Sequence, residues 1–230
     1  MIPLRDDNPT SRKPYVTIAL IVANVLVFLY QTAQGPYAEA FVMKFGLIPY
    51  ELTHRIELSP QVSFPAVATI FTSMFLHGGW MHLGGNMLYL WIFGNNIEDR
   101  LGPIRFLIFY LLSGVCAVLL FVLTGPNTQV PLVGASGAVS GILGIYALRF
   151  PRARVLTLLW LGFFVRMVWI PALAFLGIWF AMQLLFSVPT IGTSSGGGVA
   201  YMAHVGGFLF GMLGALVYKR RFEGAPRVNW

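Results

Sequence analysis

The sequence predicts an all-α membrane protein in which six transmembrane helices form one bundle, with a structured interfacial loop between the first and second helices. The chain of 230 residues is 57% hydrophobic and only 10% charged, and its mean hydropathy is +0.74. Ordinary soluble domains carry about 25% charged residues. Long apolar stretches and a one-sided distribution of basic residues support the same prediction.

Four long apolar stretches and two shorter, glycine-richer ones supply the predicted spans. A span needs about 20 mostly apolar residues. No small-residue cleavage site clearly follows Tyr30, which argues against a cleaved signal peptide. We expect a cytoplasmic tail over 1–14, a six-span domain over 15–218 and a basic cytoplasmic tail over 219–230. The spans cover about 15–31, 78–93, 104–124, 136–149, 168–188 and 199–218.

The basic residues predict the orientation. With six spans and both ends cytoplasmic, every lysine and arginine except Lys44 and Arg55 falls on the inner side. This is the positive-inside pattern of membrane proteins. The net charge of +7 therefore reflects topology and attraction to anionic lipid headgroups, and no nucleic-acid partner is predicted. Cys116 is the single cysteine, so an intramolecular disulfide is excluded.

Two connections between spans have unusual compositions. Residues 32–72 are rich in aromatic and apolar residues, so we expect a structured segment at the outer interface, with a simple solvent loop as the alternative. The run 152–167 is apolar and aromatic, and Pro151 precedes it. We expect this run in or near the inner leaflet, and we disfavour a further span because Arg166 would then lie outside. The Gly/Ser-rich segment 189–198 is a candidate mobile cap.

Polar side chains inside predicted spans are costly and therefore become functional candidates. Each of three spans that begin at the outer side carries such residues within its first turns, which places them at a similar depth in the outer leaflet. The spans begin near residues 78, 136 and 199. The candidates are His77, His82, Asn86, Ser136, Ser140 and His204.

Helical spacing predicts that the fourth and sixth spans pack closely. Small residues four apart allow membrane helices to approach one another. Such residues form one face on each of these spans, and the approach would bring Ser136 within hydrogen-bond reach of His204. The residues are Ser136, Gly137, Ser140, Gly141 and Gly144 on the fourth span and His204, Gly207 and Gly211 on the sixth.

These candidates can be combined into a serine nucleophile with its base. A serine hydroxyl needs a neighbouring base to accept its proton, and His204 could do so. None of the acidic residues falls inside a predicted span, so a Ser–His dyad is favoured over a triad. His82, the Asn86 amide and the backbone N–H of Ser136 could stabilise an oxyanion. No cofactor is required, and no metal site is predicted.

Structural roles compete with catalytic ones at each position. A GxSG segment by itself is more typical of helix packing than of catalysis. A single buried histidine is more often a structural residue held by hydrogen bonds than a catalytic residue. Ser140 is therefore assigned to packing. His77 lies off the His82 face and is expected to anchor the loop or support His82.

The chain resembles the rhomboid family of intramembrane serine proteases over all six predicted spans. Four segments occur in the family's order: HGGWMHLGGNM (77–87), IEDRLG (97–102), GASG (134–137) and AHVGGFLFG (203–211). The resemblance implies a six-helix rhomboid bundle. It also implies Ser136 as nucleophile, His204 as general base, His82 and Asn86 on the oxyanion side, and His77 as an additional histidine. Supporting residues are Gly134, Gly137, Gly141, Gly207, Gly211 and the polar pair Glu98 and Arg100.

Two departures from the family pattern are visible. The first outer loop lacks the Trp-Arg pair of many members. Four residues after the nucleophile, where an aromatic residue often stacks on the catalytic histidine, this chain has Ser140. The second departure puts the orientation of His204 in question more than the activity.

We therefore expect an endopeptidase that cleaves transmembrane or juxtamembrane segments of membrane-protein substrates near the outer face. A short chain of this kind suits a bacterial inner membrane. The main alternative is a catalytically inactive rhomboid-like protein that binds membrane proteins. A transporter would need charged midplane residues or broken, repeated helices. A zinc protease would need an HExxH motif, whereas the chain has two histidines five apart with no glutamate between them.

Overall fold

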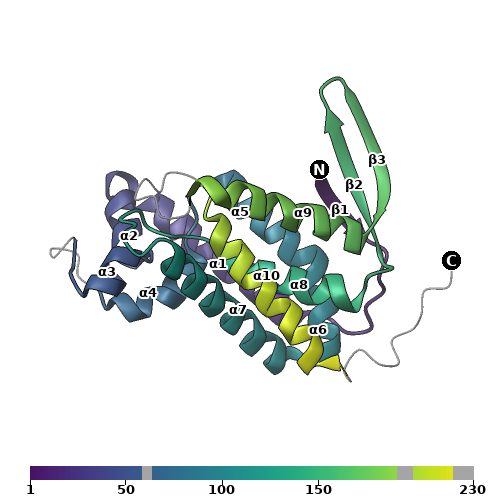
Figure 1. Cartoon of the computed structure of the whole chain (residues 1–230), viewed down its shortest axis with the longest axis horizontal. Helices are drawn as coiled ribbons and strands as arrows, with labels where there is room; N and C mark the ends of the chain where they lie inside the picture. Colours follow the sequence, from purple (N-terminus) through teal and green to yellow (C-terminus); the bar gives the residue numbers. More distant parts are fainter. Residues whose placement is uncertain (59–63, 191–198, 220–230) are drawn as a thin grey trace.

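The computed structural model describes residues 1–58, 64–190 and 199–219, and helices make up most of this part of the chain (Figure 1). The α-helices are α1 (Tyr15–Ala33), α2 (Ala38–Phe45), α3 (Pro49–His54), α4 (Ala66–Thr72), α5 (Trp80–Tyr89), α6 (Asn95–Leu101), α7 (Pro103–Thr124), α8 (Ser136–Arg149), α9 (Ala172–Ser187) and α10 (Tyr201–Val217). Short helical turns are η1 (Gly35–Tyr37), η3 (Ser73–Phe75), η4 (Leu90–Gly94) and η5 (Val188–Thr190). The strands are β1 (Ile2–Asp6), β2 (Arg154–Leu161) and β3 (Phe164–Pro171).

In helix α1 the polar side chains are mainly buried and the large apolar side chains are mainly exposed, as in a helix surrounded by lipid. Its buried side carries Thr17, Asn24 and Gln31 together with two apolar residues. Its large apolar residues lie mainly on the exposed side, where Leu26 is 60% exposed. Because lipid solvates apolar side chains, the polar groups turn inward to find partners. The buried positions follow steps of three and four residues, which explains why one face packs against the bundle.

By length and composition, α1 and α7 are the described helices that are long and apolar enough to cross a membrane. Shorter apolar helices are found over Ala66–Phe75, Ala172–Ser187 and Tyr201–Val217. The predicted count of six spans therefore stays a prediction.

The predicted second span continues further than expected. Helix α5 passes into η4, which is a turn of π-helix, and then into α6 without a break in the helical backbone. The helix ends at Gly102, whose φ of +81° suits glycine, and Pro103 begins α7. A π turn adds a residue to the helix and commonly accompanies a functional site. Here it lies directly after the helix that carries His82 and Asn86.

Helix α8 is the central helix of the bundle, since all its residues from Gly137 to Ala147 are buried. Helix α10 makes its most extensive contacts with α8. A Cβ atom on Gly207 would overlap the Gly137 carbonyl oxygen, and one on Gly211 would overlap that of Gly141. The two backbones thus touch at two successive levels, as small residues permit.

The long connection between the first two spans is folded. It contains α2, α3 and α4, and it pairs with the segment that leads to α8. Leu47 and Leu132 form a two-way backbone bridge, with N···O distances of 3.1 and 2.7 Å. Thr72 donates a hydrogen bond to the Phe45 carbonyl oxygen at 2.7 Å. The segment is therefore a structured unit, and its position at the membrane interface stays a prediction.

A three-stranded antiparallel sheet in the order β1-β2-β3 was not predicted. Residues 154–171 form a hairpin that turns at Gly162, and β1 pairs with β2 from Ile2↔Leu158 to Asp6↔Val155. The all-α class is thus corrected to a mostly helical fold with one small sheet. The predicted N-terminal tail 1–14 contains a strand, because backbone pairing with β2 orders it. The predicted fifth span loses residues 168–171 to β3.

Figure 1 shows where the sheet lies. Helices α2 and α3 lie at one end of the bundle, and α6 lies at the opposite end together with the sheet. The hairpin stands out from the side of the bundle near the start of α9. Most of the predicted C-terminal tail lies outside the described residues.

Candidate active site

Ser136 and His204 meet across the α8–α10 contact. The Ser136 Oγ and the His204 Nε2 are 2.8 Å apart, a hydrogen-bond distance. Ser136 is the first residue of α8, and His204 lies in the first turn of α10. The close glycine packing below them holds the two helix starts together. The structure thus brings together two residues that are 68 positions apart in the sequence.

Gln183 on α9 holds the other side of the imidazole, and the sequence analysis missed it. Its Oε1 lies 2.8 Å from His204 Nδ1, while its Nε2 donates to the Trp179 carbonyl oxygen at 3.3 Å. A carbonyl oxygen can only accept a hydrogen bond, so Nδ1 carries the proton. Nε2 is then free to accept the Ser136 hydroxyl proton. A glutamine in the middle of an apolar helix was itself a signal that could have identified it.

An aromatic ring accompanies His204, although it does not come from α8. The Trp179 ring on α9 lies 5.9 Å from the imidazole, with an angle of 33° between the planes. Ser140, where relatives often have an aromatic residue, is 1% exposed, and its Oγ donates to the Ser136 carbonyl oxygen at 2.6 Å. Trp179 therefore takes the place beside the imidazole that Ser140 cannot fill.

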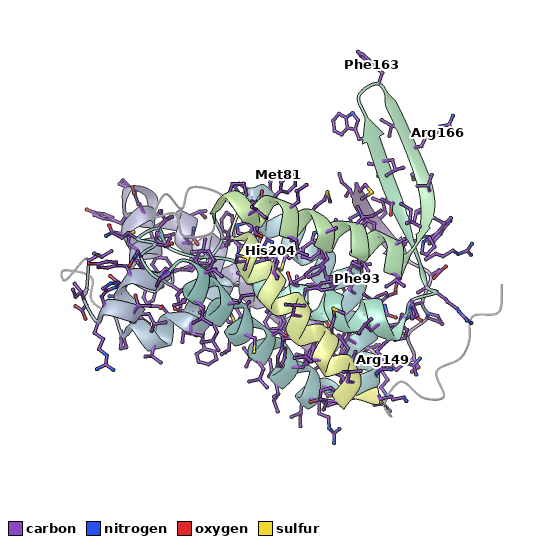
Figure 2. All side chains as sticks on the ribbon, viewed as in Figure 1. Met81, Phe93, Arg149, Phe163, Arg166 and His204 are labelled. Carbon is purple, nitrogen blue, oxygen red and sulfur yellow. The ribbon has the colours of Figure 1, made fainter. Side chains whose placement is uncertain are left out.

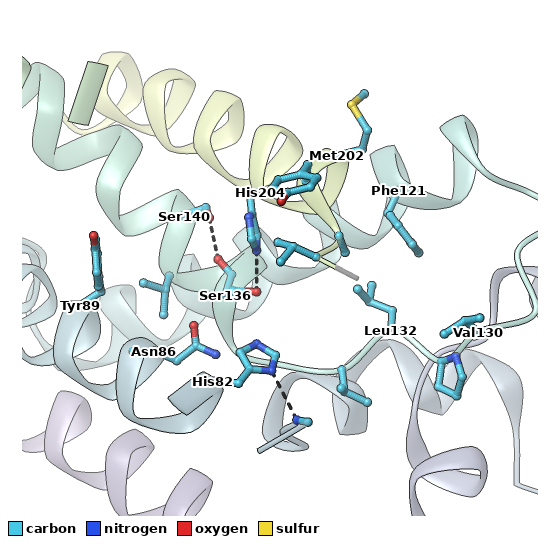
Figure 3. A pocket seen from close by; sticks show the side chains of 18 of the residues that line it. His82, Asn86, Tyr89, Phe121, Val130, Leu132, Ser136, Ser140, Met202 and His204 are labelled. Atoms are coloured by element: carbon cyan, nitrogen blue, oxygen red, sulfur yellow. Dashed lines mark hydrogen bonds between the residues drawn. The ribbon is translucent and has the colours of Figure 1, made fainter. Parts of the chain in front are cut away.

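His82 and Asn86 face Ser136 from α5 (Figure 3). The Gly78 N–H donates to His82 Nδ1 at 3.3 Å, so Nδ1 is the acceptor and Nε2 carries the proton. Asn86 is buried, and its Nδ2 has no hydrogen-bond partner among the described residues. Buried donors are rarely left unpaired in proteins. Both side chains thus present N–H groups to the same space.

Gly134 allows this arrangement. Its φ of +123° is rarely adopted by other residues, and its N–H donates to the Ser73 carbonyl oxygen at 2.9 Å. A Cβ atom here would lie 2.7 Å from the His82 ring. A side chain at Gly134 would therefore displace His82. The same backbone turn delivers the chain to Ser136, whose N–H has no intrahelical acceptor because it begins a helix.

These groups line one cavity of about 710 Å³. Ser136, His204, His82, Asn86, Tyr89 and Trp179 all contribute to its wall. This volume lies in the range of pockets that hold a ligand. Residues 191–198, most of the candidate cap, lie outside the described residues. Within the described residues, no group of three potential metal ligands occurs.

His77 lies behind this wall. It is fully buried, and it is not among the described residues that line the cavity. The Gln31 side chain bonds the backbone N–H and carbonyl of His77, at 3.2 and 2.7 Å. The His77 ring packs edge-on against His82, with 5.2 Å between centroids. It therefore supports His82 from behind.

Glu98 and Arg100 form no ion pair with each other in the described part of the chain, whereas Arg154 and Asp7 do, with 3.1 Å between Nε and Oδ2. Instead, Glu98 accepts hydrogen bonds from the backbone N–H groups of Val16 and Thr17, at 2.9 and 2.8 Å. A carboxylate at a helix N-terminus satisfies unpaired donors and the helix dipole. Glu98 thus fixes the start of α1 to α6.

The sequence is similar to those of several known proteins. A family model described as a Rhomboid domain matches residues 65–221. Rhomboid protein 1, mitochondrial, from Saccharomyces cerevisiae is 31% identical over 209 residues, which are 85% of this chain and 51% of that protein. Rhomboid-like protein 11, chloroplastic, from Arabidopsis thaliana is 39% identical over 106 residues, 45% of this chain and 38% of the relative.

Putative rhomboid protease YdcA from Bacillus subtilis is 38% identical over 77 residues, 34% of this chain and 38% of that protein. The chain spans about half the length of the yeast relative and less of the other two. The named relatives are mitochondrial, chloroplastic and bacterial, so they do not support a bacterial inner membrane over an organellar one. The family model covers more than half of the chain, and the chain therefore belongs to the rhomboid family of membrane proteins.

Proposed function

We propose that this protein is an intramembrane serine endopeptidase that cleaves transmembrane or juxtamembrane segments of membrane-protein substrates. The observation that carries the proposal is the 2.8 Å contact between Ser136 Oγ and His204 Nε2. Gln183 supports it, because its acceptor oxygen leaves Nε2 free to act as a base. The name of one relative, Putative rhomboid protease YdcA, is consistent with this reaction class.

The reaction would begin with attack of Ser136 Oγ on the scissile carbonyl carbon, while His204 Nε2 accepts the hydroxyl proton. Collapse of the tetrahedral intermediate breaks the C–N bond, and the imidazolium gives its proton to the leaving amine. A water molecule then attacks the acyl-enzyme ester, again with His204 as base. This second step releases the new carboxyl end and restores the Ser136 hydroxyl.

The oxyanion of each tetrahedral intermediate would be stabilised by three N–H groups. Asn86 Nδ2 is buried and has no partner within the described chain, His82 Nε2 carries a proton, and the N–H of Ser136 lies at the start of a helix. Donors held in place before the charge develops need no reorganisation during reaction. Removing one such donor in other enzymes lowers kcat by roughly 10²–10³-fold.

The proposed orientation places the active site at the outer side. Lys44 is in α2, and Ser136 and His204 begin α8 and α10 near that end of the bundle (Figure 1). Arg55 follows α3 at the same end as Lys44, and the other basic residues of the described chain lie toward the opposite end, which the positive-inside distribution assigns to the cytoplasm or its equivalent. We retain six spans over 15–218, two cytoplasmic ends and a bacterial inner membrane as parts of this proposal.

The test is cleavage of a model transmembrane substrate by protein reconstituted in lipid vesicles. Ser136→Ala and His204→Ala should each abolish cleavage, because either change removes the activated nucleophile. Ser140→Ala is the matched control, since it removes a hydroxyl one helical turn away without touching His204. A serine-directed fluorophosphonate should label the wild-type protein at Ser136 only, as read by mass spectrometry.

Cleavage that survives Ser136→Ala would refute the proposal. An inactive binding protein would instead be supported if a membrane protein copurifies with the wild type but is never cleaved, and if the fluorophosphonate does not label Ser136.

Asn86→Ala tests the oxyanion role of Asn86 separately from any role in folding. It should lower kcat by about 10²-fold with little change in KM.

A further inference from the structure

Beyond its first pair, Arg154↔Pro171, the β2–β3 hairpin has one face made of apolar side chains. Directly opposite residues on antiparallel strands point to the same face of a sheet. Every second pair of the register therefore lies on the same face, and the three pairs of this face between Leu156 and the turn are all apolar. We call this set the apolar hairpin face. Its pairs are Leu156↔Trp169, Leu158↔Met167 and Trp160↔Val165.

The part of this face nearest the turn and the hairpin tip are exposed, while Leu156 and Leu158 are partly buried. Trp160 is 69% exposed, Val165 59% and Met167 65%. Phe163 is fully exposed, and it sits at the far end of the hairpin, away from the helices (Figure 2). An exposed apolar patch of this kind usually marks an interaction surface. The hairpin therefore needs a partner that solvates large aromatic and aliphatic side chains.

The charges on the same segment are all positive. Residues 152–171 include Arg152, Arg154 and Arg166 and no acidic residue. Arg5 and Arg154 place their guanidinium groups 5.5 and 5.8 Å from the Trp169 ring, and Arg154 also pairs with Asp7. Arg152 and Arg166 are both exposed. Aromatic rings combined with arginine are the composition of segments that lie at a membrane surface.

The position of the hairpin fits such a surface. It leaves the bundle at the end where α6 lies and extends across the direction of the helices (Figure 1). The helices cross the bilayer, so a segment that extends sideways from their ends runs along the bilayer surface. The basic residues assign this end to the inner leaflet, whose anionic lipids attract arginine.

We propose that the β2–β3 hairpin is an interfacial anchor that lies in the headgroup region of the inner leaflet. Trp160, Phe163 and Met167 are in contact with the acyl-chain boundary, and Arg152 and Arg166 bind anionic lipid phosphates. The proposal rests on the orientation given above and does not depend on proteolytic activity. Pairing of β3 with a second copy is disfavoured, because it would bring like charges at Arg166 together.

The chain permits a clean fluorescence test because Cys116 is its single cysteine. A Cys116→Ala background accepts Phe163→Cys, labelled with an environment-sensitive NBD dye, in vesicles that contain phosphatidylglycerol. The dye should emit at shorter wavelength, be quenched by lipids carrying a shallow doxyl group and be protected from aqueous iodide. Thr10→Cys is the control, since it is exposed in the polar segment that follows β1 at the same end of the bundle. Its dye should be quenched by iodide only.

Equal iodide quenching at Phe163→Cys and Thr10→Cys would overturn the anchor. Protection from iodide at Phe163→Cys that decreases as the protein is diluted with lipid would also overturn it, since a second copy would then cover the surface.

A second experiment tests the role of lipid charge by comparing phosphatidylglycerol vesicles with pure phosphatidylcholine vesicles. Doxyl quenching should fall by about half in phosphatidylcholine or in an Arg152→Glu/Arg166→Glu variant. Unchanged quenching in both would refute the phosphate contacts.

Discussion

Gln183 shows how one amide determines which nitrogen of His204 can act as a base. Its Nε2 donates to the Trp179 carbonyl oxygen one helical turn back, so its Oε1 is held toward His204 Nδ1. In serine proteases a carboxylate usually has this task. In a low-dielectric membrane interior, a neutral amide avoids the cost of burying a charge. The proposed centre is therefore a dyad with a neutral third residue that positions the imidazole.

Replacing Gln183 by Met tests this positioning role. Methionine has a similar length but no oxygen to accept the Nδ1 proton, so the imidazole loses the bond that fixes its tautomer and orientation. We expect Gln183→Met to lower kcat by roughly 10–10²-fold, with KM within about twofold of wild type. Steady-state cleavage of a transmembrane substrate measures both constants.

Gln183→Glu provides the rescue, because a carboxylate oxygen can accept the same hydrogen bond. It should recover a large part of the kcat that Gln183→Met loses. A purely structural role predicts a different order, in which the apolar Met is tolerated and the buried Glu is not. Met variants as active as wild type would therefore contradict the positioning role.

At the scale of single elements, hydropathy predicted several of the helices, but it did not predict the sheet. The predicted spans at 15–31, 104–124 and 136–149 agree with α1, α7 and α8 to within a few residues. Residues 154–171 are apolar on one face except at Arg154 and mostly apolar on the other, so they lack the alternation of apolar and polar residues that identifies a strand. β1 is short and contains Pro3, and only its pairing with β2, nearly 150 residues away, makes it a strand. Such non-local pairing cannot be read from a single sequence.

β1 is attached to the bundle by the partly buried carboxyl group of Asp6. Asp6 accepts hydrogen bonds from the Tyr146 hydroxyl at 2.5 Å and from Asn96 Nδ2 at 2.8 Å. The pKa of Asp6 is raised from 3.8 to about 6, chiefly by burial and also by the neighbouring Asp7, while the hydrogen bonds from Tyr146 and Asn96 act in the opposite direction. The attached strand thus binds a proton more tightly than the detached one does.

This raised pKa predicts that β1 detaches more easily as the pH rises. The attached state holds more protons between pH 3.8 and about 6, so its stability is greatest below pH 3.8 and falls through pH 6. The loss is of the order of 3 kcal/mol. Hydrogen exchange of the Ile2–Asp6 amides, corrected for the intrinsic effect of pH, should show protection that decreases from pH 4 to pH 7.

Asp6→Asn removes the titration and keeps an acceptor oxygen, so its protection should be independent of pH and higher than wild type at pH 7. Asp7→Asn is the control, because it breaks the ion pair with Arg154 and should lower protection at pH 7. Wild-type protection that is constant from pH 4 to pH 7 would show that Asp6 does not control attachment.

At the scale of the whole molecule, the active-site geometry depends on how closely α8 and α10 pack. The sequence identified the glycines of this contact, because their four-residue spacing is local information. It could not identify the partners from α9, since Gln183 and Trp179 depend on which face of α9 meets His204. The family resemblance identified Gly134, but the physical reasons for glycine there, its positive φ and the adjacent His82 ring, come only from the structure.

Gly211 and Gly177 form a matched pair for testing this dependence. A Cβ atom on Gly211 would overlap the Gly141 carbonyl oxygen, which is backbone and cannot turn aside. A Cβ atom on Gly177, also within an apolar helix, would meet nothing within 4 Å. Gly211→Ala should therefore push α10 away from α8 and destabilise the protein by about 1–3 kcal/mol. Gly177→Ala should be neutral or stabilising by up to about 1 kcal/mol, because alanine favours a helix.

The displacement in Gly211→Ala should also reach the active site, although Gly211 lies about two helical turns from His204. A shift of about 1 Å between Ser136 and His204 can lower the cleavage rate by roughly 10²-fold. Thermal unfolding and cleavage, measured in the same detergent, should show both losses in Gly211→Ala and neither in Gly177→Ala. If Gly211→Ala is destabilised yet cleaves at the wild-type rate, the dyad is held together by the loops before α8 and α10, and the glycine contact serves stability alone.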